Sequence, residues 1–207
     1  MTGPADLIRA DAARLARIDP DLARAAAVAG DFTVPVRPPG FATLIWLIIG
    51  QQISIAAAKA LFERLTATLG EVTPAGLLTL DDPAMRACGF TRMKAEYARG
   101  LATAIEDGTF DLDAVASLDD EGALAALTSL RGIGRWTAEN YLMWALGRRD
   151  VVPAGDLALR IGWQRLCDLE EPPGEPALRA LATRWSPHRT AASFLIWYFY
   201  LGDRAGD

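Results

Sequence analysis

Two segments of the chain combine residue types that could do chemistry. The first, residues 127–146, reads LTSLRGIGRWTAENYLMWAL, where a turn at Gly132 and Gly134 joins two stretches of helical periodicity. Glycines around one apolar residue suit a tight turn, and the next helix begins with N–H groups that lack a helical partner. These groups and the positive end of the helix dipole favour binding of an anion such as a phosphate. Close packing of the two helices would explain the same glycines.

The second segment places a carboxylate at the start of a helix. Asp156 follows a Pro-Ala-Gly turn in VVPAGDLALRIGW, about twenty residues after the glycine turn, and precedes an amphipathic pattern. Its residue type and position are typical of a helix N-cap. A carboxylate kept ionised by the helix dipole and amide donors could also stabilise a positive charge that develops in a transition state. The two roles are compatible, and the local sequence leaves both open.

Helices must position these two segments. Apolar residues recur at spacings of three and four through most of the chain, and alternating patterns occur only near residues 33–36 and 151–152. We therefore predict an all-α protein. The predicted helices cover residues 5–18, 21–29, 41–69 with a break near Gly50, 74–80, 83–88, 91–107, 119–128, 134–147, 156–168, 175–185 and 188–201.

Composition excludes several classes of protein. The 207 residues are 51% hydrophobic and 23% charged, which is typical of a globular chain. Two cysteines and one histidine are too few for a disulfide scaffold, a four-cysteine iron–sulfur cluster or a His-rich metal site. The N-terminus has no apolar signal segment, and the longest apolar run, at 44–50, is far shorter than the roughly 20 residues of a membrane span. We therefore expect a cytoplasmic protein without a membrane partner.

Charge is distributed unevenly along the chain. The formal net charge is −5, and residues 106–121 carry seven acidic and no basic side chains, so that segment should avoid a polyanion. By contrast, residues 86–100 and residues 131–149 each carry a local excess of three positive charges. Such clusters are typical either of solvated helix faces or of a surface that binds a polyanion.

Five segments, in the same order, resemble the helix-hairpin-helix GPD superfamily of DNA base-excision glycosylases, and within it the 3-methyladenine DNA glycosylase II (AlkA-type) branch. The segments are FATLIWLIIGQQISIAAAKAL (41–61), GFTRMKAEYARGLA (89–102), LRGIGRWTAENYLMWAL (130–146), VVPAGDLALR (151–160) and WSPHRTAASFLIWYF (185–199). The resemblance covers about residues 40–200 and leaves out the N-terminal β-domain of larger members. It implies one glycosylase unit over residues 1–207 with a cleft between two helical subdomains. The central subdomain is expected over about 46–150, with the hairpin at 127–146, and the other over about 1–45 and 151–207.

The resemblance also implies roles for individual residues. Asp156 stands where the family has its catalytic aspartate. Expected DNA contacts are the hairpin, the helix start after it and a side chain that fills the hole left by an extruded nucleotide: Gly132, Gly134, Arg135, Trp136, Thr137 and Gln52. Aromatic side chains expected at the base pocket are Trp46, Trp136, Tyr141, Trp144 and Trp197, although ordinary core positions would explain them equally well. The carbonyls of Leu130 and Ile133 are expected to hold a structural Na⁺ or K⁺, and no other cofactor is expected.

Together these residues predict a DNA repair enzyme acting as a monomer on double-stranded DNA with damaged bases. It would flip out alkylated (methylated) bases and hydrolyse the N-glycosidic bond without cutting the strand. One alternative is a bifunctional glycosylase/lyase, which needs a lysine to form a Schiff base. The chain has only Lys59 and Lys94, and Trp136 stands where such relatives carry the hairpin lysine. Another alternative is a non-catalytic DNA-binding module in which Asp156 is only a cap.

Overall fold

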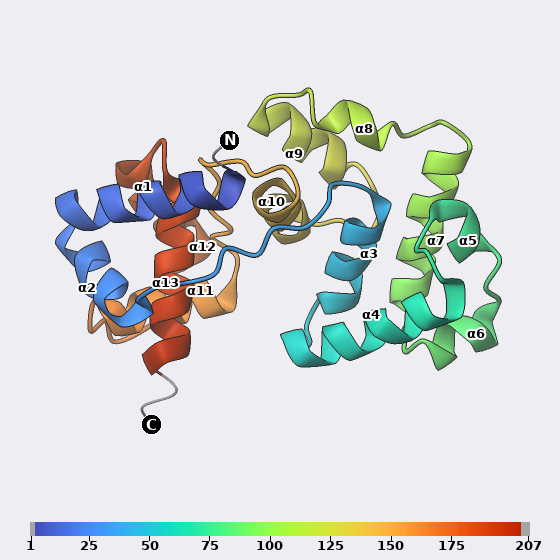
Figure 1. The fold of residues 1–207 in the computed structure, drawn as a ribbon, viewed down its shortest axis with the longest axis horizontal. Coiled ribbons are helices and arrows are strands. Elements are labelled where there is room, and N and C mark those ends of the chain that lie inside the picture. Colours follow the sequence, from blue (N-terminus) through green and yellow to red (C-terminus); the bar gives the residue numbers. More distant parts are fainter. Residues whose placement is uncertain (1–2, 204–207) are drawn as a thin grey trace. The chain divides into compact units, whose positions relative to one another are not determined.

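The computed structural model of the protein describes residues 3–203. All regular elements in this range are helices, without a strand, so the predicted all-α class is confirmed (Figure 1). The chain divides into a terminal unit, Met1–Val36 with Gly147–Asp207, and a central unit, Arg37–Leu146. The central unit begins nine residues before the expected position near 46, because α3 (Phe41–Gly50) is one continuous helix within this unit.

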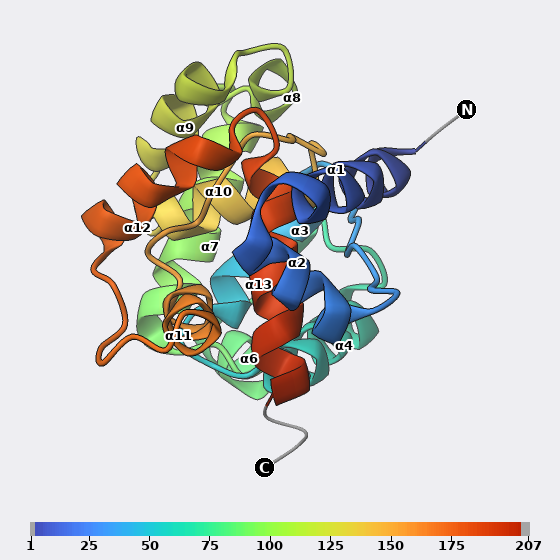
Figure 2. The ribbon, with the colours of Figure 1, turned by 90° about the vertical axis from the view of Figure 1, so that its left-hand side faces the viewer.

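The terminal unit is built around its last helix (Figure 2). α13 (Arg189–Asp203) packs against α1, α2 and α11. Gly162 of α11 permits a close approach, since a Cβ there would lie 2.9 Å from the backbone oxygen of Ile196 in α13. The remaining elements of this unit are α1 (Pro4–Ile18), α2 (Pro20–Ala29), α11 (Leu157–Leu166), α12 (Glu175–Leu181) and the short 3₁₀ helix η1 (Ala182–Trp185).

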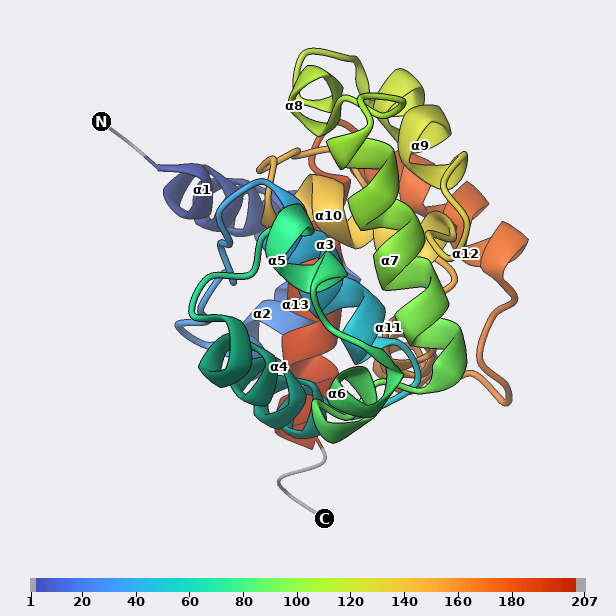
Figure 3. The ribbon, with the colours of Figure 1, turned by 90° about the vertical axis from the view of Figure 1, so that its right-hand side faces the viewer.

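The central unit forms around α3, which is apolar on all sides and buried from Thr43 to Ile49. This helix packs against α4, α7 and α10, and Figure 3 shows α7 running along the outer side of the unit. A helix that is apolar all round must be covered on several faces, which explains its central position. The other helices here are α4 (Ile55–Leu69), α5 (Pro74–Leu78), α6 (Asp82–Ala87), α7 (Arg92–Glu106), α8 (Leu112–Val115), α9 (Asp120–Thr128) and α10 (Arg135–Trp144).

Most predicted helices are confirmed, and the differences have local causes. The helix expected over 41–69 is interrupted at residues 51–54, where Ser54 accepts a hydrogen bond from Ala57 N (3.2 Å) and starts α4 as its N-cap. The four-residue helix α8 was not predicted, and Asp111 caps it. The segments near 33–36 and 151–152 are irregular. Among the helices of residues 3–203, none is both long and apolar enough to cross a membrane.

Candidate functional site

The glycine turn joins α9 to α10 as predicted. Ile133 N donates to Leu130 O at 3.1 Å, and the Ile133 side chain is buried. Gly132 has a φ of +89°, and a Cβ at this position would overlap the ring of Tyr97 in α7. Only glycine meets both conditions without strain. The helix-hairpin-helix arrangement therefore depends on Gly132 for its backbone and on Ile133 for its anchor.

Gly134 has a different role from Gly132. It is the N-cap of α10 with φ −80° and ψ 172°, a conformation open to other residues, and a Cβ there would meet nothing within 4 Å. The fold therefore does not require glycine at 134. Gly134 provides no side-chain capping bond, so the backbone at the start of α10 is not covered by a side chain of its N-cap. This is the arrangement that lets an anion approach a helix N-terminus closely.

The turn between α3 and α4 (residues 51–54) is tied to the hairpin by Gln51. Gln51 Nε2 donates to Gly132 O at 3.0 Å and to Thr137 Oγ1 at 3.1 Å. Lys94 Nζ of α7 donates to Ile49 O (2.6 Å) and Gln51 O (2.7 Å), and burial lowers the pKa of Lys94. These bonds hold the α3–α4 turn, the hairpin and the start of α7 together as one rigid corner of the central unit.

Gln52 lies at the exposed tip of this corner. Its φ of +61° is in the left-handed region, which is uncommon for a residue other than glycine. Thr137, by contrast, is 1% exposed and its hydroxyl accepts from Gln51, so only its backbone could contact DNA. Arg135 also differs from a free surface cation, because its Nε donates to the buried Glu139 at 2.9 Å.

The four aromatic candidates of the central unit occupy different environments. Tyr141 is 1% exposed and its hydroxyl accepts from Gly40 N at 2.9 Å, while burial raises its pKa. This places Tyr141 in the core, without a free ring face. Trp136 and Trp144 are half-buried on α10, and the buried Nε1 of Trp144 has no hydrogen-bond partner in the described residues.

Trp46 is covered by an arginine that the sequence did not single out. The guanidinium carbon of Arg37 lies 3.6 Å from the Trp46 ring centroid, and burial lowers the pKa of Arg37. The other contact of Trp46 is edge-to-face with Phe62, at a centroid distance of 5.5 Å. A cation–π contact of this kind occupies one face of the indole. Like the ring of Tyr141, the ring of Trp46 therefore packs against other residues of the central unit.

In the terminal unit the predicted carboxylate is confirmed as a helix cap. Asp156 is the N-cap of α11, and its Oδ1 accepts from Leu159 N at 2.8 Å. The same oxygen accepts from the indole Nε1 of Trp197 in α13 at 3.0 Å. The structure thus brings together two predicted site residues that are 41 positions apart. The indole fixes the orientation of a half-buried carboxylate at the positive end of a helix.

Sequence reasoning missed Gln51, Lys94 and Arg37 as residues that support the site. Gln51 and Lys94 act through bonds to segments more than 40 positions away. No local pattern reports such bonds. The available signal was the pair of glutamines that ends a long apolar run, because polar side chains at the end of a buried helix need partners.

Comparison with known proteins places this geometry in a family. Residues 45–187 match the family described as HhH-GPD superfamily base excision DNA repair protein. Putative DNA-3-methyladenine glycosylase YfjP of Bacillus subtilis is 32% identical over 158 residues, which cover 72% of this chain but only 55% of that protein. DNA-3-methyladenine glycosylase 1 of Schizosaccharomyces pombe is 34% identical over 158 residues, covering 74% of this chain and 69% of that protein.

Solved structures agree with the sequence comparison. The 3-methyladenine DNA glycosylase Mag1 of Schizosaccharomyces pombe, solved in complex with abasic DNA, has a TM-score of 0.83 and 30% identity. The match covers 90% of this chain and 94% of that one. The chain spans about half the length of the Bacillus relative. The family match at residues 45–187 includes both the hairpin and Asp156. The protein therefore belongs to the HhH-GPD superfamily of base excision DNA repair proteins.

Proposed function

We propose that the protein is a monofunctional DNA glycosylase that hydrolyses the N-glycosidic bond of alkylated bases in double-stranded DNA. The observation that carries the proposal is Asp156, a carboxylate oriented at the N-terminus of α11 by Leu159 N and Trp197 Nε1. Such a group suits stabilisation of a cationic transition state. The similarity to proteins named DNA-3-methyladenine glycosylases supports alkylated bases as the substrate class.

The chemistry needs little acid catalysis. A ring-methylated purine carries a positive charge, so it leaves as a neutral base and takes the electron pair of the glycosidic bond with it. Asp156 stabilises the oxocarbenium-like sugar and accepts a proton from the water whose oxygen bonds to the anomeric carbon. The indole of Trp197, which donates to Asp156, attracts the cationic base by a cation–π contact worth about 1 to 2 kcal/mol when desolvated.

DNA binding is assigned to the central unit. The N-terminus of α10, whose N-cap Gly134 makes no side-chain capping bond, holds a backbone phosphate by its N–H groups, which positions the duplex without reading its sequence. Gln52, exposed at the α3–α4 turn, fills the space left by the extruded nucleotide. The protein acts as a monomer because one hairpin and one carboxylate suffice for one lesion.

The hairpin carbonyls also suit a monovalent cation. Leu130 and Ile133 provide backbone oxygens, which are hard ligands suited to Na⁺ or K⁺. Leu130 O accepts the N–H of Ile133 at 3.1 Å, and a carbonyl oxygen keeps a second lone pair for an ion. A cation bound there would supply a positive charge that attracts the phosphate.

The lysines argue against a lyase. Lys94 Nζ is bound to two backbone carbonyls, and Lys59 lies on α4 at 3.8 Å from Glu63. The hairpin position of the lyase lysine is taken by Trp136. A nucleophilic amine must be deprotonated and near the sugar. The position of neither lysine meets this requirement at the hairpin.

The proposal is tested by measuring free bases released from DNA that has been treated with a methylating agent. Purified protein without added cofactor should release methylated purines and leave abasic sites uncut. Borohydride added during the reaction should trap no covalent complex. Binding of duplex without any base release would identify a DNA-binding module, and a trapped adduct lost on changing Lys59 or Lys94 would identify a lyase.

A further inference from the structure

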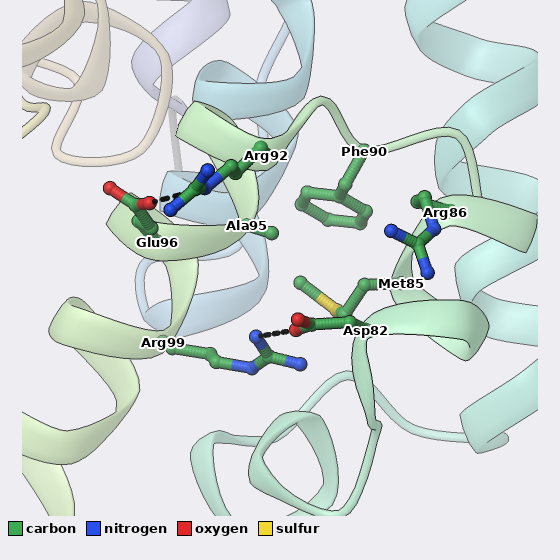
Figure 4. Close-up of a pocket in the computed structure, with 8 residues that line it drawn as sticks. All are labelled: Asp82, Met85, Arg86, Phe90, Arg92, Ala95, Glu96 and Arg99. Carbon is green, nitrogen blue, oxygen red and sulfur yellow. Dashed lines mark hydrogen bonds and ion pairs between the residues drawn. The ribbon is translucent and has the colours of Figure 1, made fainter.

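A groove of about 330 Å³ opens between α6 and the first turns of α7 in the central unit (Figure 4). Its floor is apolar and consists of Met85, Phe90 and Ala95. Its rim carries arginines 86, 92 and 99. None of these residues takes part in the glycosylase site proposed above, and together they place positive charge around a small apolar floor.

The three arginines are not equivalent. Arg99 is neutralised, since its guanidinium contacts Asp82 at 2.5 Å and Leu80 O at 2.8 Å. Arg92 has a side chain that is 95% exposed, with its Nε 3.3 Å from Glu96. For Arg86 no carboxylate lies within ion-pair distance in the part of the chain that the structure describes. Two of the three cations therefore remain accessible to an anionic ligand.

The groove is continuous with the hairpin through Glu96. The carboxylate of Glu96 contacts Arg92 and, at 3.6 Å, the guanidinium of Arg131, the residue just before Gly132. Arg131 is itself exposed. One carboxylate thus lies between two arginines, one on the rim of the groove and one in the hairpin, and cannot balance both charges.

The same turn of α7 carries Lys94, which binds the α3–α4 turn. The start of α7 is therefore fixed to both elements assigned to DNA binding, the hairpin and the turn that carries Gln52. Exposed cations at this corner stand out against a net charge of −5. An anion that reaches the hairpin meets Arg131, then Arg92, then Arg86.

We propose that this groove is a second binding site for the DNA backbone. Arg86 and Arg92 contact phosphates beyond the one held at the start of α10, and a deoxyribose packs on the floor formed by Met85 and Phe90. The ligand class rests on the proposed function, because the continuity with the hairpin is what favours DNA over an acidic peptide.

The test is the salt dependence of binding to an undamaged duplex. Each phosphate contact contributes about 0.9 to the slope of log affinity against log salt. The double variant Arg86→Gln/Arg92→Gln should therefore lose about two units of slope. When salt rises fourfold, from about 50 to 200 mM, the affinity of this variant for the duplex should fall about tenfold less than that of the wild type.

Two control variants isolate the site. Arg14→Gln/Arg17→Gln removes the same charge from exposed positions of α1 and should leave the slope closer to that of the wild type. Arg86→Lys/Arg92→Lys keeps the charge and should restore most of the slope. Melting curves check the fold of all three variants.

The outcomes separate this inference from the proposed function. A Gln variant with the wild-type slope would overturn the groove as a DNA site while leaving the glycosylase intact. Retained DNA binding combined with loss of binding to a fluorescent poly-glutamate peptide would assign the groove to an acidic protein segment instead. A wild-type protein that neither binds duplex nor releases bases would overturn both proposals.

Discussion

Two aspartates of the terminal unit, Asp19 and Asp156, have the same kinds of hydrogen-bond donor. Asp19 caps α2 and Asp156 caps α11. Each also accepts a hydrogen bond from an indole, Trp185 Nε1 at 2.8 Å for Asp19 and Trp197 Nε1 at 3.0 Å for Asp156. Both carboxylates therefore accept one indole N–H in addition to a backbone capping bond, yet only one is proposed to do chemistry.

The two carboxylates differ in burial and in which of their oxygens accepts each of these hydrogen bonds. At Asp19 one oxygen accepts from the backbone N–H groups of Asp21 and Leu22, and the other accepts from the indole and lies 3.1 Å from the guanidinium of Arg184. Asp19 is 9% exposed. At Asp156 the backbone N–H of Leu159 and the indole of Trp197 both donate to Oδ1, and the residue is half-buried. A capping aspartate that is almost fully buried beside a cation, such as Asp19, serves stability, whereas a half-buried one such as Asp156 keeps surface that a substrate can contact.

The largest expected effect is that of Asp156→Asn on base release. The Asn oxygen can still accept from Leu159 N and Trp197 Nε1, and Asn is a good N-cap, so stability should change by well under ~1 kcal/mol. The lost charge is expected to supply ~3 to 4 kcal/mol in the transition state, so excision should slow ~100-fold to ~1000-fold. The measurement is single-turnover release from a defined methylated duplex.

Two further readouts accompany this variant. Its affinity for DNA should hold or rise, because a negative charge has been removed. A melting curve should show a fold close to that of the wild type. Near-normal base release by a well-folded Asp156→Asn protein would show that Asp156 is only a helix cap, as Asp19 is, and would contradict its proposed catalytic role.

Asp19→Asn should show the opposite pattern. One of the two carboxylate oxygens is replaced by an NH₂ group, which cannot accept a hydrogen bond. In one orientation this group faces Trp185 and Arg184, and in the other it faces the backbone N–H groups of α2, so buried donors lose their acceptor in either case. We expect a loss of about 1 to 3 kcal/mol in the free energy of unfolding. Base release per folded molecule should be unchanged. Denaturant unfolding and single-turnover kinetics on the same preparation measure both, and slowed chemistry at full stability would contradict the assignment.

Trp197→Phe tests whether the indole N–H that donates to Asp156 contributes to base release. Phenylalanine keeps an aromatic ring but removes Nε1, so Asp156 keeps its cap bond and loses the bond that fixes its orientation. A hydrogen bond to a charged group contributes about 1.5 to 3 kcal/mol. We expect the transition state to lose about 1.4 kcal/mol of this stabilisation, which corresponds to a tenfold slower base release. Trp185→Phe is the matched control, and it should leave release unchanged.

The smallest expected effect is that of Arg184→Gln. The variant removes the cation beside Asp19 but keeps the indole and backbone donors. Because Arg184 is 41% exposed, the loss in stability should stay below ~1 kcal/mol, with no effect on base release. Thermal melting at low and high salt checks this, since an ion-pair contribution shrinks as salt rises. A large, salt-independent loss would show that Arg184 acts mainly by packing on Trp163 and Trp185.

Features that depend on neighbouring residues could be predicted from the amino-acid sequence. Apolar spacing predicted the helices, the Pro-Ala-Gly turn placed Asp156 as a cap, and Gly132 and Gly134 placed the hairpin. These features follow from local backbone preferences and from hydrogen bonds within three or four positions. The break after Gly50 was predictable for the same reason, whereas the four-residue α8 was too short to show a period.

The contacts between these features became visible in the folded protein alone. The indole of Trp197 reaches Asp156 across 41 positions, and Gln51 reaches Gly132 across 81. Tyr97 explains why position 132 must be glycine, while nothing near Gly134 requires it. Local pattern shows neither the indoles that donate to Asp19 and Asp156 nor the difference between a free arginine such as Arg86 and a committed one such as Arg99. The partners that neutralise, orient or expose a charge come from distant segments, and their positions are set by packing rather than by local pattern.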